Sequence, residues 1–457
     1  MRTLMIGLLV LAMGTVAYAE LQNVEVGGSI RIRGSWYEGT DPDLTDIFWW
    51  NRHPGTYVQD TSFVEQRTRV NVKADFTDNV SAFIELDSWD VWGEDFRSNY
   101  VTGADARGVS NDDVEVYQAY IEANEMFGYP LRLRVGRQEL SLGSEWLVGV
   151  NDNSSLFRGL SFDAVTLNYA TDMASVTAIW AKLAETFSDF SDDDADLYAL
   201  YGSYLGLEDI VIDAYWMFVR DEVAVIGTQA DLHTIGLRGA GTYGAFDFEA
   251  EVAYQFGEVE FPDTGWWFWR QDNDVDFSEW GGNLEVGYTF DMNYQPRVYL
   301  GFAYLGGGDL TDNTFWPWDE PDLEMPFNRL FSNWEYSEFL ANTDLSNVLI
   351  YRLGGSMMPT ESIALGLDLS YFDVDEEAPD WGWWPFRQNA DGNLGIETNL
   401  HAEYHYSEDL AFRVGWAHFF SDDGVEDWNR WPDNALTAVS AYDDDMDYLY
   451  WETQIAF

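Results

Sequence analysis

The sequence contains no cysteine among its 457 residues, and it is poor in basic residues. The absence of cysteine excludes disulfide bonds, thiol catalysis and cysteine-ligated metals. Lysine and arginine total 23 against 81 aspartates and glutamates, which gives a formal net charge of −58. We expect no binding to nucleic acid by bulk electrostatics at this charge. The acidity alone would also fit a disordered tail or a salt-adapted protein, but an aromatic content of 17% argues against disorder.

Long apolar runs are also missing beyond the first residues of the chain. Met1–Ala19 has a basic residue at Arg2, an apolar stretch over Leu4–Val10 and the sequence Ala17-Tyr18-Ala19. This pattern is typical of a secretory signal peptide and is too interrupted for a membrane anchor of roughly 20 apolar residues. We therefore expect residues 1–19 to be a signal peptide and residues 20–457 to be one exported domain. Since no later stretch suits a transmembrane helix, insertion into a membrane would require a closed β-barrel.

The last residues of the chain alternate between apolar and polar side chains. One face carries Leu449, Trp451, Thr453, Ile455 and Phe457, and the other carries Tyr450, Glu452 and Gln454. A soluble edge strand would show the same alternation, but a two-residue period with an apolar outer face is typical of a transmembrane β-strand. A terminal phenylalanine on such a strand is the usual assembly signal of outer-membrane barrels, and we assign this role to Phe457.

Similar alternating runs recur along the whole chain. Each is about ten residues long, the length that a tilted transmembrane strand requires. We expect about eighteen strands, near Val24–Tyr37, Phe63–Thr77, Val80–Trp92, Val114–Ala123, Leu131–Glu139, Ser161–Ala170, Ala174–Ala184, Asp196–Leu205, Ile210–Asp221, Asp231–Gly241, Phe246–Phe256, Gly281–Phe290, Pro296–Gly306, Ser346–Met358, Ser362–Phe372, Leu394–Tyr406, Leu410–Phe420 and Asp445–Phe457.

The connections between these runs are of two kinds. Short turns include Ala170–Met173, Gly241–Ala245 and Tyr406–Asp409, whereas long connections include Glu38–Ser62 and Gly307–Leu345. A barrel with both termini in the periplasm has short turns on that side, long loops outside and an even number of strands. The sequence therefore predicts an all-β fold, a transmembrane antiparallel barrel of the bacterial outer membrane. A soluble sandwich or propeller would not require this alternation of connections.

Several short stretches resemble the alginate-export family of outer-membrane porins. They are Glu65-Gln66-Arg67-Thr68-Arg69, Gly136-Arg137-Gln138-Glu139-Leu140 followed by Gly143, Arg158 before Phe162-Asp163, His233-Thr234-Ile235-Gly236-Leu237-Arg238, Phe327-Asn328-Arg329-Leu330-Phe331 and His418-Phe419-Phe420. The resemblance spans the mature chain. It implies a monomeric eighteen-stranded barrel whose lumen is constricted by inward loops and passes a polysaccharide or small solutes passively.

Charged residues on the faces expected to point inward are the candidates for lining a permeation path. They are Arg31, Arg33, Arg67, Arg69, Arg132, Arg134, Arg238, Arg413, Glu65, Glu85, Asp87, Glu397 and Glu403. The family's pore is understood to be strongly basic, whereas here the arginines are mixed with acids. The alternative interpretation is that these charges solvate a water-filled wall and pair across strands.

The long connections hold clusters of tryptophan among acidic residues. The candidates are Trp49, Trp50, Trp266, Trp267, Trp269, Trp316, Trp318, Trp383 and Trp384. Aromatic faces beside carboxylates suit sugar binding. The alternative is that they pack the loops together and form the outer aromatic girdle.

Two acidic runs raise the question of a metal ion. Asp192-Asp193-Asp194-Ala195-Asp196 and Asp443-Asp444-Asp445-Met446-Asp447 could supply oxygen ligands to calcium, but neither has the spacing and central glycine of a calcium loop. We expect no resident metal or cofactor, with loop-bound calcium as the weaker alternative.

The sequence as a whole favours a channel rather than an enzyme, since no Ser/His/Asp arrangement has recognisable spacing. We expect passive transport of polysaccharide or small solutes through a charged lumen. The expected partners are outer-membrane lipid, the barrel-assembly machinery and the solute. A scaffold barrel that sheathes a partner or binds surfaces through its loops, with no solute of its own, is the alternative.

Overall fold

A computed structural model describes most of the expected strands and several connections. The described residues are 21–38, 61–77, 79–93, 114–150, 152, 157, 159–185, 194–222, 229–260, 274–309, 324–340, 345–376, 392–422, 424 and 445–457. The predicted signal peptide and the nine candidate loop tryptophans lie outside these ranges, as do parts of both acidic runs.

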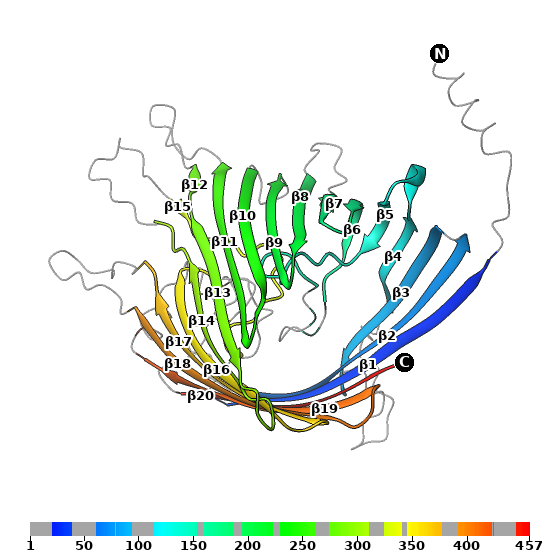
Figure 1. The fold of residues 1–457 in the computed structure, drawn as a ribbon. Coiled ribbons are helices and arrows are strands. Elements are labelled where there is room, and N and C mark those ends of the chain that lie inside the picture. Colours follow the sequence, from blue (N-terminus) through cyan, green and yellow to red (C-terminus); the bar gives the residue numbers. More distant parts are fainter. Residues whose placement is uncertain are drawn as a thin grey trace, which may run out of the picture.

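Within the described residues, eighteen long strands form a closed antiparallel barrel (Figure 1). They are β1 (Asn23–Glu38), β2 (Thr61–Thr77), β3 (Val80–Val91), β4 (Glu115–Ala123), β5 (Leu131–Gln138), β6 (Phe162–Ala170), β7 (Ala174–Glu185), β8 (Asp194–Leu207), β9 (Ile210–Asp221), β10 (Gln229–Tyr243), β11 (Phe246–Glu260), β13 (Trp280–Thr289), β14 (Arg297–Leu305), β16 (Val348–Thr360), β17 (Ile363–Val374), β18 (Asn393–His405), β19 (Leu410–Ser421) and β20 (Met446–Ala456). The eighteen predicted strands are therefore confirmed, with ends that differ by a few residues.

Two further strands are very short. β12 (Val275–Phe277) continues the pairing of β11, and it pairs in parallel with β15 (Glu324–Met325). The described residues also include one short 3-10 turn, Met126–Gly128, between β4 and β5. In the part of the chain that the structure describes, no helix is long and apolar enough to cross a bilayer.

The alternation of the sequence determines which side chains face lipid. On β20, Leu449, Trp451 and Ile455 are exposed on the outer face, whereas Tyr448, Tyr450 and Glu452 are buried on the inner face. This arrangement confirms the prediction for the last strand. The other strands repeat it, because side chains on a strand point alternately to the two faces of the sheet.

The barrel closes through the first and last strands. β1 pairs with β2 on one side and with β20 on the other. The main chain of Phe457 exchanges two hydrogen bonds with Gly28, at 2.9 and 3.0 Å. A Cβ atom on Gly28 would lie 3.0 Å from the Phe457 ring, so glycine leaves room for the ring to cover β1. Phe457 is therefore part of the seam that closes the barrel.

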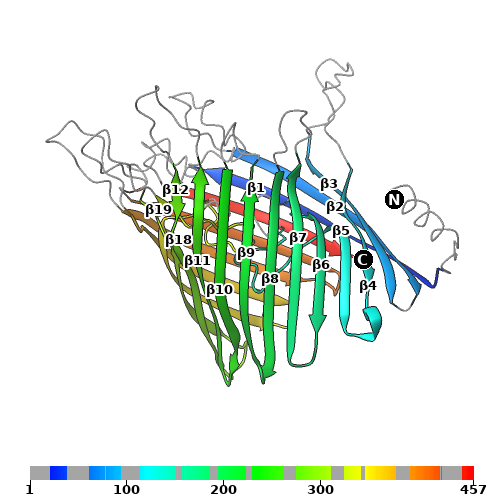
Figure 2. The same cartoon turned by 90° about the horizontal axis from the view of Figure 1, so that it is seen from above.

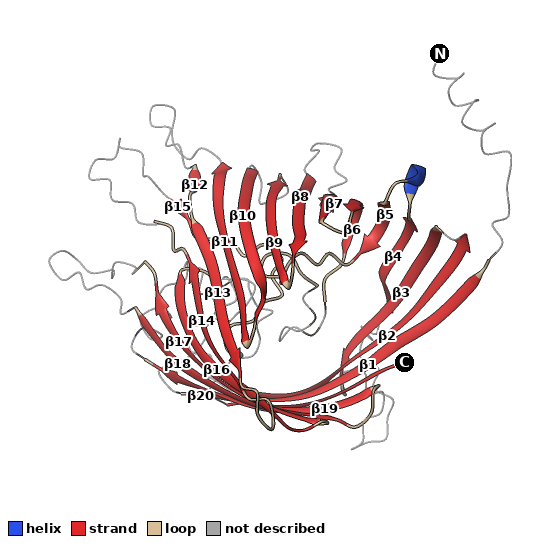
Figure 3. Ribbon diagram, viewed as in Figure 1, coloured by secondary structure: helices blue, strands red, loops and turns tan. Residues whose placement is uncertain are grey.

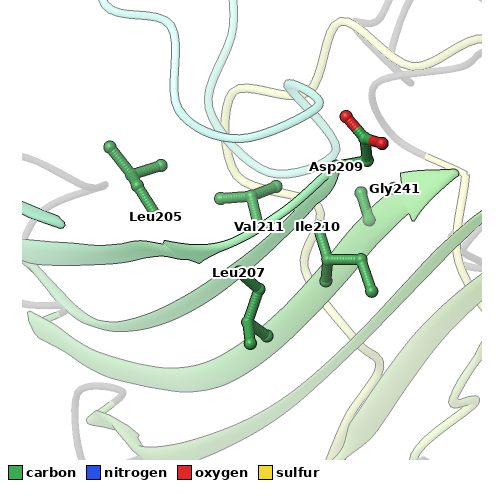
Figure 4. Close-up of a pocket in the computed structure, with 7 residues that line it drawn as sticks. Leu205, Leu207, Asp209, Ile210, Val211 and Gly241 are labelled. Atoms are coloured by element: carbon green, nitrogen blue, oxygen red, sulfur yellow. The ribbon is translucent and has the colours of Figure 1, made fainter. Parts of the chain in front are cut away.

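Short turns join neighbouring strands at one end of the barrel, as predicted for the periplasmic side. Figure 2 shows the β8–β9 and β10–β11 turns at this same end. Only two residues separate Leu207 from Ile210, and two separate Tyr243 from Phe246. A shallow hollow of about 370 Å³ lies at the β8–β9 turn (Figure 4). Its lining is mainly aliphatic, with Asp209 as the one charged member, so it lacks the groups expected of a polar solute site.

An aromatic row on the outer face marks the boundary of the membrane at the end of the barrel that carries the long connections. Trp180, Tyr198, Phe218, His233 and Phe256 lie directly opposite one another on β7 to β11. Two residues further along each strand, a charged row follows, with the members Lys182, Asp196, Arg220, Asp231 and Glu258 in the same register. Aromatic rings favour the interface and charges favour water, so this step from one row to the next is where the bilayer ends.

One connection differs from the prediction. We predicted that Gly307–Leu345 would be an external loop, but its described part, residues 326–340, packs against inward-facing side chains of the wall. Figure 3 shows tan connections crossing the space that the strands enclose. The general rule of long loops outside therefore does not hold for these residues, which agree instead with the inward loops that the resemblance implied. The physical reason is that Phe327, Tyr336 and Leu340 are apolar or aromatic, and they gain more by burial than by exposure.

Candidate permeation site in the lumen

Among the described residues, two connections enter the barrel and pack against its inner wall. The first inner segment comprises the described residues between β5 and β6, namely 139–150, 152, 157 and 159–161. The second inner segment comprises residues 326–340, between β15 and β16. The strands of the wall lie around both segments, so their packing decides which part of the lumen stays accessible to water (Figure 3).

The two inner segments are joined along their backbones. Val148 and Phe331 form a parallel bridge. The amide of Gly149 donates to the carbonyl of Phe331, and the amide of Phe331 donates to the carbonyl of Leu147, both at 2.8 Å. These bonds satisfy main-chain groups that would otherwise be costly to bury. The two segments therefore behave as one packed unit.

Aromatic side chains fill the junction between the segments. Trp146 is fully buried, and its ring stacks on Phe327 with centroids 5.6 Å apart. Its indole nitrogen donates to the Tyr336 hydroxyl at 2.8 Å, and that hydroxyl donates to Asn283 on β13 at 3.0 Å. Removing a buried aromatic side chain of this kind typically costs about 3–5 kcal/mol. The junction is therefore a hydrophobic core within the barrel.

Two candidate arginines on β1 hold the first inner segment against the wall. Arg31 and Arg33 both pair with Glu452 of β20, at 2.9 and 2.8 Å. Their guanidinium groups lie 4.4 and 5.2 Å from the ring of Phe157, which is fully buried. Arg31 also donates to the carbonyl of Asp152. Cation–π contact and ion pairing thus both fix this end of the segment.

The neighbouring candidates on β2 and β3 complete this basic cluster. Arg67 forms a 2.6 Å ion pair with Asp87, and both side chains are only 3% exposed. Arg69 lies 3.4 Å from Glu139 and from Asp152 of the first inner segment, and 3.8 Å from Glu85. Glu65 accepts a hydrogen bond from Trp89 at 3.0 Å. These candidates meet as predicted on the inner face, but the first inner segment covers them.

The second inner segment is attached to β18 through the candidate Glu397. Its carboxylate accepts hydrogen bonds from the Ser337 hydroxyl at 2.5 Å and from the Glu338 amide at 3.0 Å. Asn399 of β18 donates to the side chain of Glu338 at 3.0 Å. Burial raises the pKa of the Glu338 carboxyl above its usual range, and the nearby Arg33 partly opposes this effect. Glu397 therefore anchors the segment and does not face open water.

The charges on the opposite side of the wall differ in their exposure from strand to strand. Arg238 bridges Asp213 and Glu249 at 2.7 and 2.9 Å. Arg297 bridges Asp247 and Glu285 at 2.5 and 2.7 Å. The side chains of Asp247 and Glu285 are 32% and 22% exposed, compared with 3% for Arg67. The β10–β16 side of the inner wall therefore has accessible charges on β11 to β14, and its carboxylates outnumber its arginines, whereas Arg238 and Asp213 are only 11% and 2% exposed.

The remaining candidates lie apart from the inner segments. Arg134 pairs with Glu122 at 2.7 Å, and Arg413 pairs with Glu403 at 3.0 Å. Arg132 is exposed and forms no ion pair among the described residues.

The sequence reasoning missed several charged residues of the inner wall. Asp213, Asp247, Glu285, Arg297 and Arg352 all lie on predicted strands, and alternation alone would have placed them inward. Trp334 and Glu145 lie in connections, where no periodic signal exists.

A closed eighteen-stranded barrel with an apolar outer face and a charged, narrowed interior defines an outer-membrane channel protein. Residues 51–430 match the model of the alginate export family, and the chain belongs to that family. The predicted family and eighteen-stranded barrel are thereby confirmed, and with them the location in the bacterial outer membrane.

Solved structures share this fold at low sequence identity. OccAB3 of Acinetobacter baumannii superposes with a TM-score of 0.54 and 12% identity, covering 95% of this chain and 100% of its own. OccK8 (OprE) of Pseudomonas aeruginosa gives a TM-score of 0.53 and 11% identity, with coverage of 95% and 98%. No curated protein sequence matches the chain. At such identities these likenesses show the fold, and the site must be argued from this chain's own residues.

Proposed function

We propose that this outer-membrane channel passes hydrophilic solutes by diffusion along the β10–β16 side of its lumen. The observation that supports this route is the contrast in exposure between the two sides of the wall. The basic cluster on β1 and β2 is buried beneath the first inner segment, whereas Asp247 and Glu285 on the opposite side remain accessible. Because charged side chains that line a pore select its ions, the accessible carboxylates would favour cations.

The expected alginate-type cargo fits this wall poorly. A polyuronate carries one carboxylate per sugar, and it would meet further carboxylates on the accessible side. Like charges repel in a narrow, partly desolvated space, so passage of a polyanion would require divalent cations such as calcium to screen the wall and the outer loops. The proposal therefore favours small neutral or cationic solutes over polyuronate.

The other parts of the proposal concern the assembled state. The protein would act as a monomer surrounded by outer-membrane lipid and be inserted by the barrel-assembly machinery, with Phe457 as the recognition residue. We propose transport without catalysis, and no resident metal. Among the described residues, Asp194 and Asp196 of the first acidic run bind Lys182 at 2.7 and 3.2 Å, so a lysine already occupies these two carboxylates.

Conductance in planar bilayers tests the channel proposal. The purified barrel should give stepwise conductance in KCl, and proteoliposomes should take up small sugars. A scaffold barrel that only sheathes a partner would be silent in both measurements. Silence in a sample whose barrel is folded, as shown by a heat-dependent gel shift, would overturn the proposed function in favour of the scaffold.

A further inference from the structure

A polar cavity lies where the two inner segments meet the accessible wall. Its volume is about 640 Å³, which falls within the range of about 300–1,000 Å³ that is typical of small-molecule sites. The first inner segment contributes Ser144 and Glu145, and the second contributes Trp334 and Glu335. Glu285 of β13 and Arg352 of β16 complete the lining from the wall. Any solute that follows the route proposed above would pass this cavity.

The charges around the cavity are unequal. Three carboxylates line it, on Glu145, Glu285 and Glu335, against the single guanidinium of Arg352. Arg352 lies 4.0 Å from Glu285, and it donates a hydrogen bond to the Tyr299 hydroxyl at 3.1 Å. Behind the lining, Ser144 donates to a further carboxylate, Glu251 of β11, at 3.4 Å. Arg297 also pairs with Glu285 from the wall, so three lining carboxylates face two guanidinium groups and the cavity keeps an excess of negative charge.

The carboxylates are held in place from behind. Glu145 accepts a hydrogen bond from Asn333 at 2.6 Å, while the amide of Asn333 donates to the Glu145 carbonyl at 3.0 Å. Glu285 accepts from Arg297 at 2.7 Å. Groups fixed in this way can attract a passing charge without first reorganising, which is the advantage of a preorganised site.

The spacing of the carboxylates decides which kind of cation suits the cavity. Among the described residues, no three acidic or histidine side chains are close enough together to hold one metal ion. Dispersed carboxylates instead suit an organic cation that presents several donors at different points. Trp334 adds an aromatic surface, which favours the flat face of a sugar ring or an ammonium group.

We propose that this cavity is a transient binding site for small solutes that carry a protonated amine, with amino sugars as the class that uses both the carboxylates and Trp334. This inference rests on the proposed function and names a substrate class for it. Neutral sugars pass with less attraction, and sugar acids are repelled.

Three related sugars test the proposal with the full-length protein in proteoliposomes. Glucosamine, N-acetylglucosamine and glucuronate have similar rings with positive, neutral and negative charge. At about pH 6 a sugar amine is protonated, as is an α-amino group with a pKa of about 7.7. At low salt, glucosamine should enter about tenfold faster than N-acetylglucosamine, because electrostatic focusing raises association rates by at least about tenfold. Glucuronate should enter most slowly. At about 1 M salt, where the Debye length is about 3 Å, the ratio should approach one.

Charge-neutralising variants assign the effect to the cavity. Glu145→Gln combined with Glu285→Gln should remove most of the preference, measured as the ratio of the glucosamine rate to the N-acetylglucosamine rate in the same preparation. Glu258→Gln removes one charge from the outward face of β11, and it should leave the preference unchanged. If the double variant does not give a heat-modifiable barrel, Glu335→Gln alone should still lower the preference.

The outcomes separate this inference from the channel proposal. Equal entry of glucosamine and N-acetylglucosamine, or faster entry of glucuronate, would overturn the amine site but leave the channel intact. A preference that survives in the cavity variants would likewise overturn it, since the selectivity would then come from elsewhere. Failure of all three sugars to enter would reject the channel itself.

Discussion

The Trp146 indole nitrogen donates a 2.8 Å hydrogen bond to the hydroxyl of Tyr336, 190 residues further along the chain. The same hydroxyl donates to Asn283 on β13. The two inner segments and the wall are therefore linked by two consecutive hydrogen bonds in a site that excludes water. Buried bonds of this kind are costly to leave unmade, so the relationship constrains both segments at once.

Loss of the indole donor should loosen the inner segments. Trp146→Phe retains an aromatic ring but removes the bond to Tyr336, and we expect a loss of about 1–3 kcal/mol in the free energy of unfolding. Single-channel recordings should show larger current fluctuations, because the segments move more freely in the lumen. Trp216→Phe, on the outer face of β9, is the matched control. Recordings and unfolding curves identical to the parent protein would show that the bond does not hold the segments.

Removing one partner of the buried ion pair between Arg67 and Asp87 should destabilise the protein, because the other charge stays buried without a partner. Arg67→Ala leaves the Asp87 carboxylate 3% exposed without its partner, and breaking a buried pair in this way typically costs about 3–5 kcal/mol. Replacing both residues with alanine should recover part of the loss. Denaturant unfolding in detergent micelles measures both values.

A second pair serves as the control for this experiment. Arg137 and Asp163 are joined at 2.9 Å on the outer face, with side chains 44% and 56% exposed. Exposed ion pairs contribute about 0–1 kcal/mol to the free energy of unfolding, so Arg137→Ala should change that free energy little. Equal losses at Arg67 and Arg137 would contradict the structure's placement of the basic cluster beneath the first inner segment.

Docking of the second inner segment should depend on pH through Glu338. Burial raises the pKa of this carboxyl above its ordinary value of 4.5. Between 4.5 and the raised value, the folded protein binds more protons at this residue than the unfolded protein does. The contribution of Glu338 to stability therefore falls as pH rises through that window.

A glutamine at position 338 reproduces the protonated form without titrating. Glu338→Gln should match the parent protein at the acidic end of the window and be more stable than it at neutral pH. Thermal melting at several pH values measures the difference, with Glu258→Gln as a control for the loss of one charge. A difference that stays constant with pH would show that Glu338 does not titrate in the docked segment.

Deletion of Phe457 should impair assembly. Its main chain bonds to Gly28 at both the amide and the carbonyl, and its ring lies over β1. Without it the seam between β1 and β20 loses its last pair of bonds, and the yield of heat-modifiable barrel in outer membranes should fall severalfold. Phe290→Ala, at the end of β13, tests whether loss of any exposed aromatic residue has the same result.

Ion selectivity should follow the accessible carboxylates and the acidity of the chain. The net charge of −58 predicts a negative potential along the water-filled route, and thus a preference for cations. The preference should weaken with salt, since the Debye length falls from about 30 Å at 0.01 M to about 3 Å at 1 M. Reversal potentials across a KCl gradient at two ionic strengths measure it. Anion preference at low salt would mean that the arginines govern permeation, and polyuronate would again become the favoured solute.

The sequence predicted the wall better than the interior for a physical reason. The alternation in β20, from Leu449 to Phe457, is local, because each side chain faces lipid or lumen independently of its neighbours. The same rule could have placed Glu285 and Arg352 in the lumen, since both lie on predicted strands. The pairing of the strands could also be predicted, because strands that follow one another in the chain pair with each other.

The inner segments carry no such periodic signal. Trp146, Leu147 and Val148 form a short apolar run in a connection, and this run alone does not reveal whether it packs inside or outside. Its burial depends on Phe327 and Tyr336, which lie far away in the sequence. The arginines on β1 were predicted to point inward, but their cover by Phe157 depends on the packing of a connection that has no periodic pattern.

The separation of Trp146 from Tyr336 also has a kinetic consequence. Apart from the β1–β20 seam, each strand of the wall pairs with a neighbour that is close in sequence, so the wall can form hairpin by hairpin, while contacts between distant residues form slowly. We therefore expect the junction between the two inner segments to form after the hairpins of the wall. In this order of folding the lumen is wide at first, and the pore reaches its final size only when the two segments have docked.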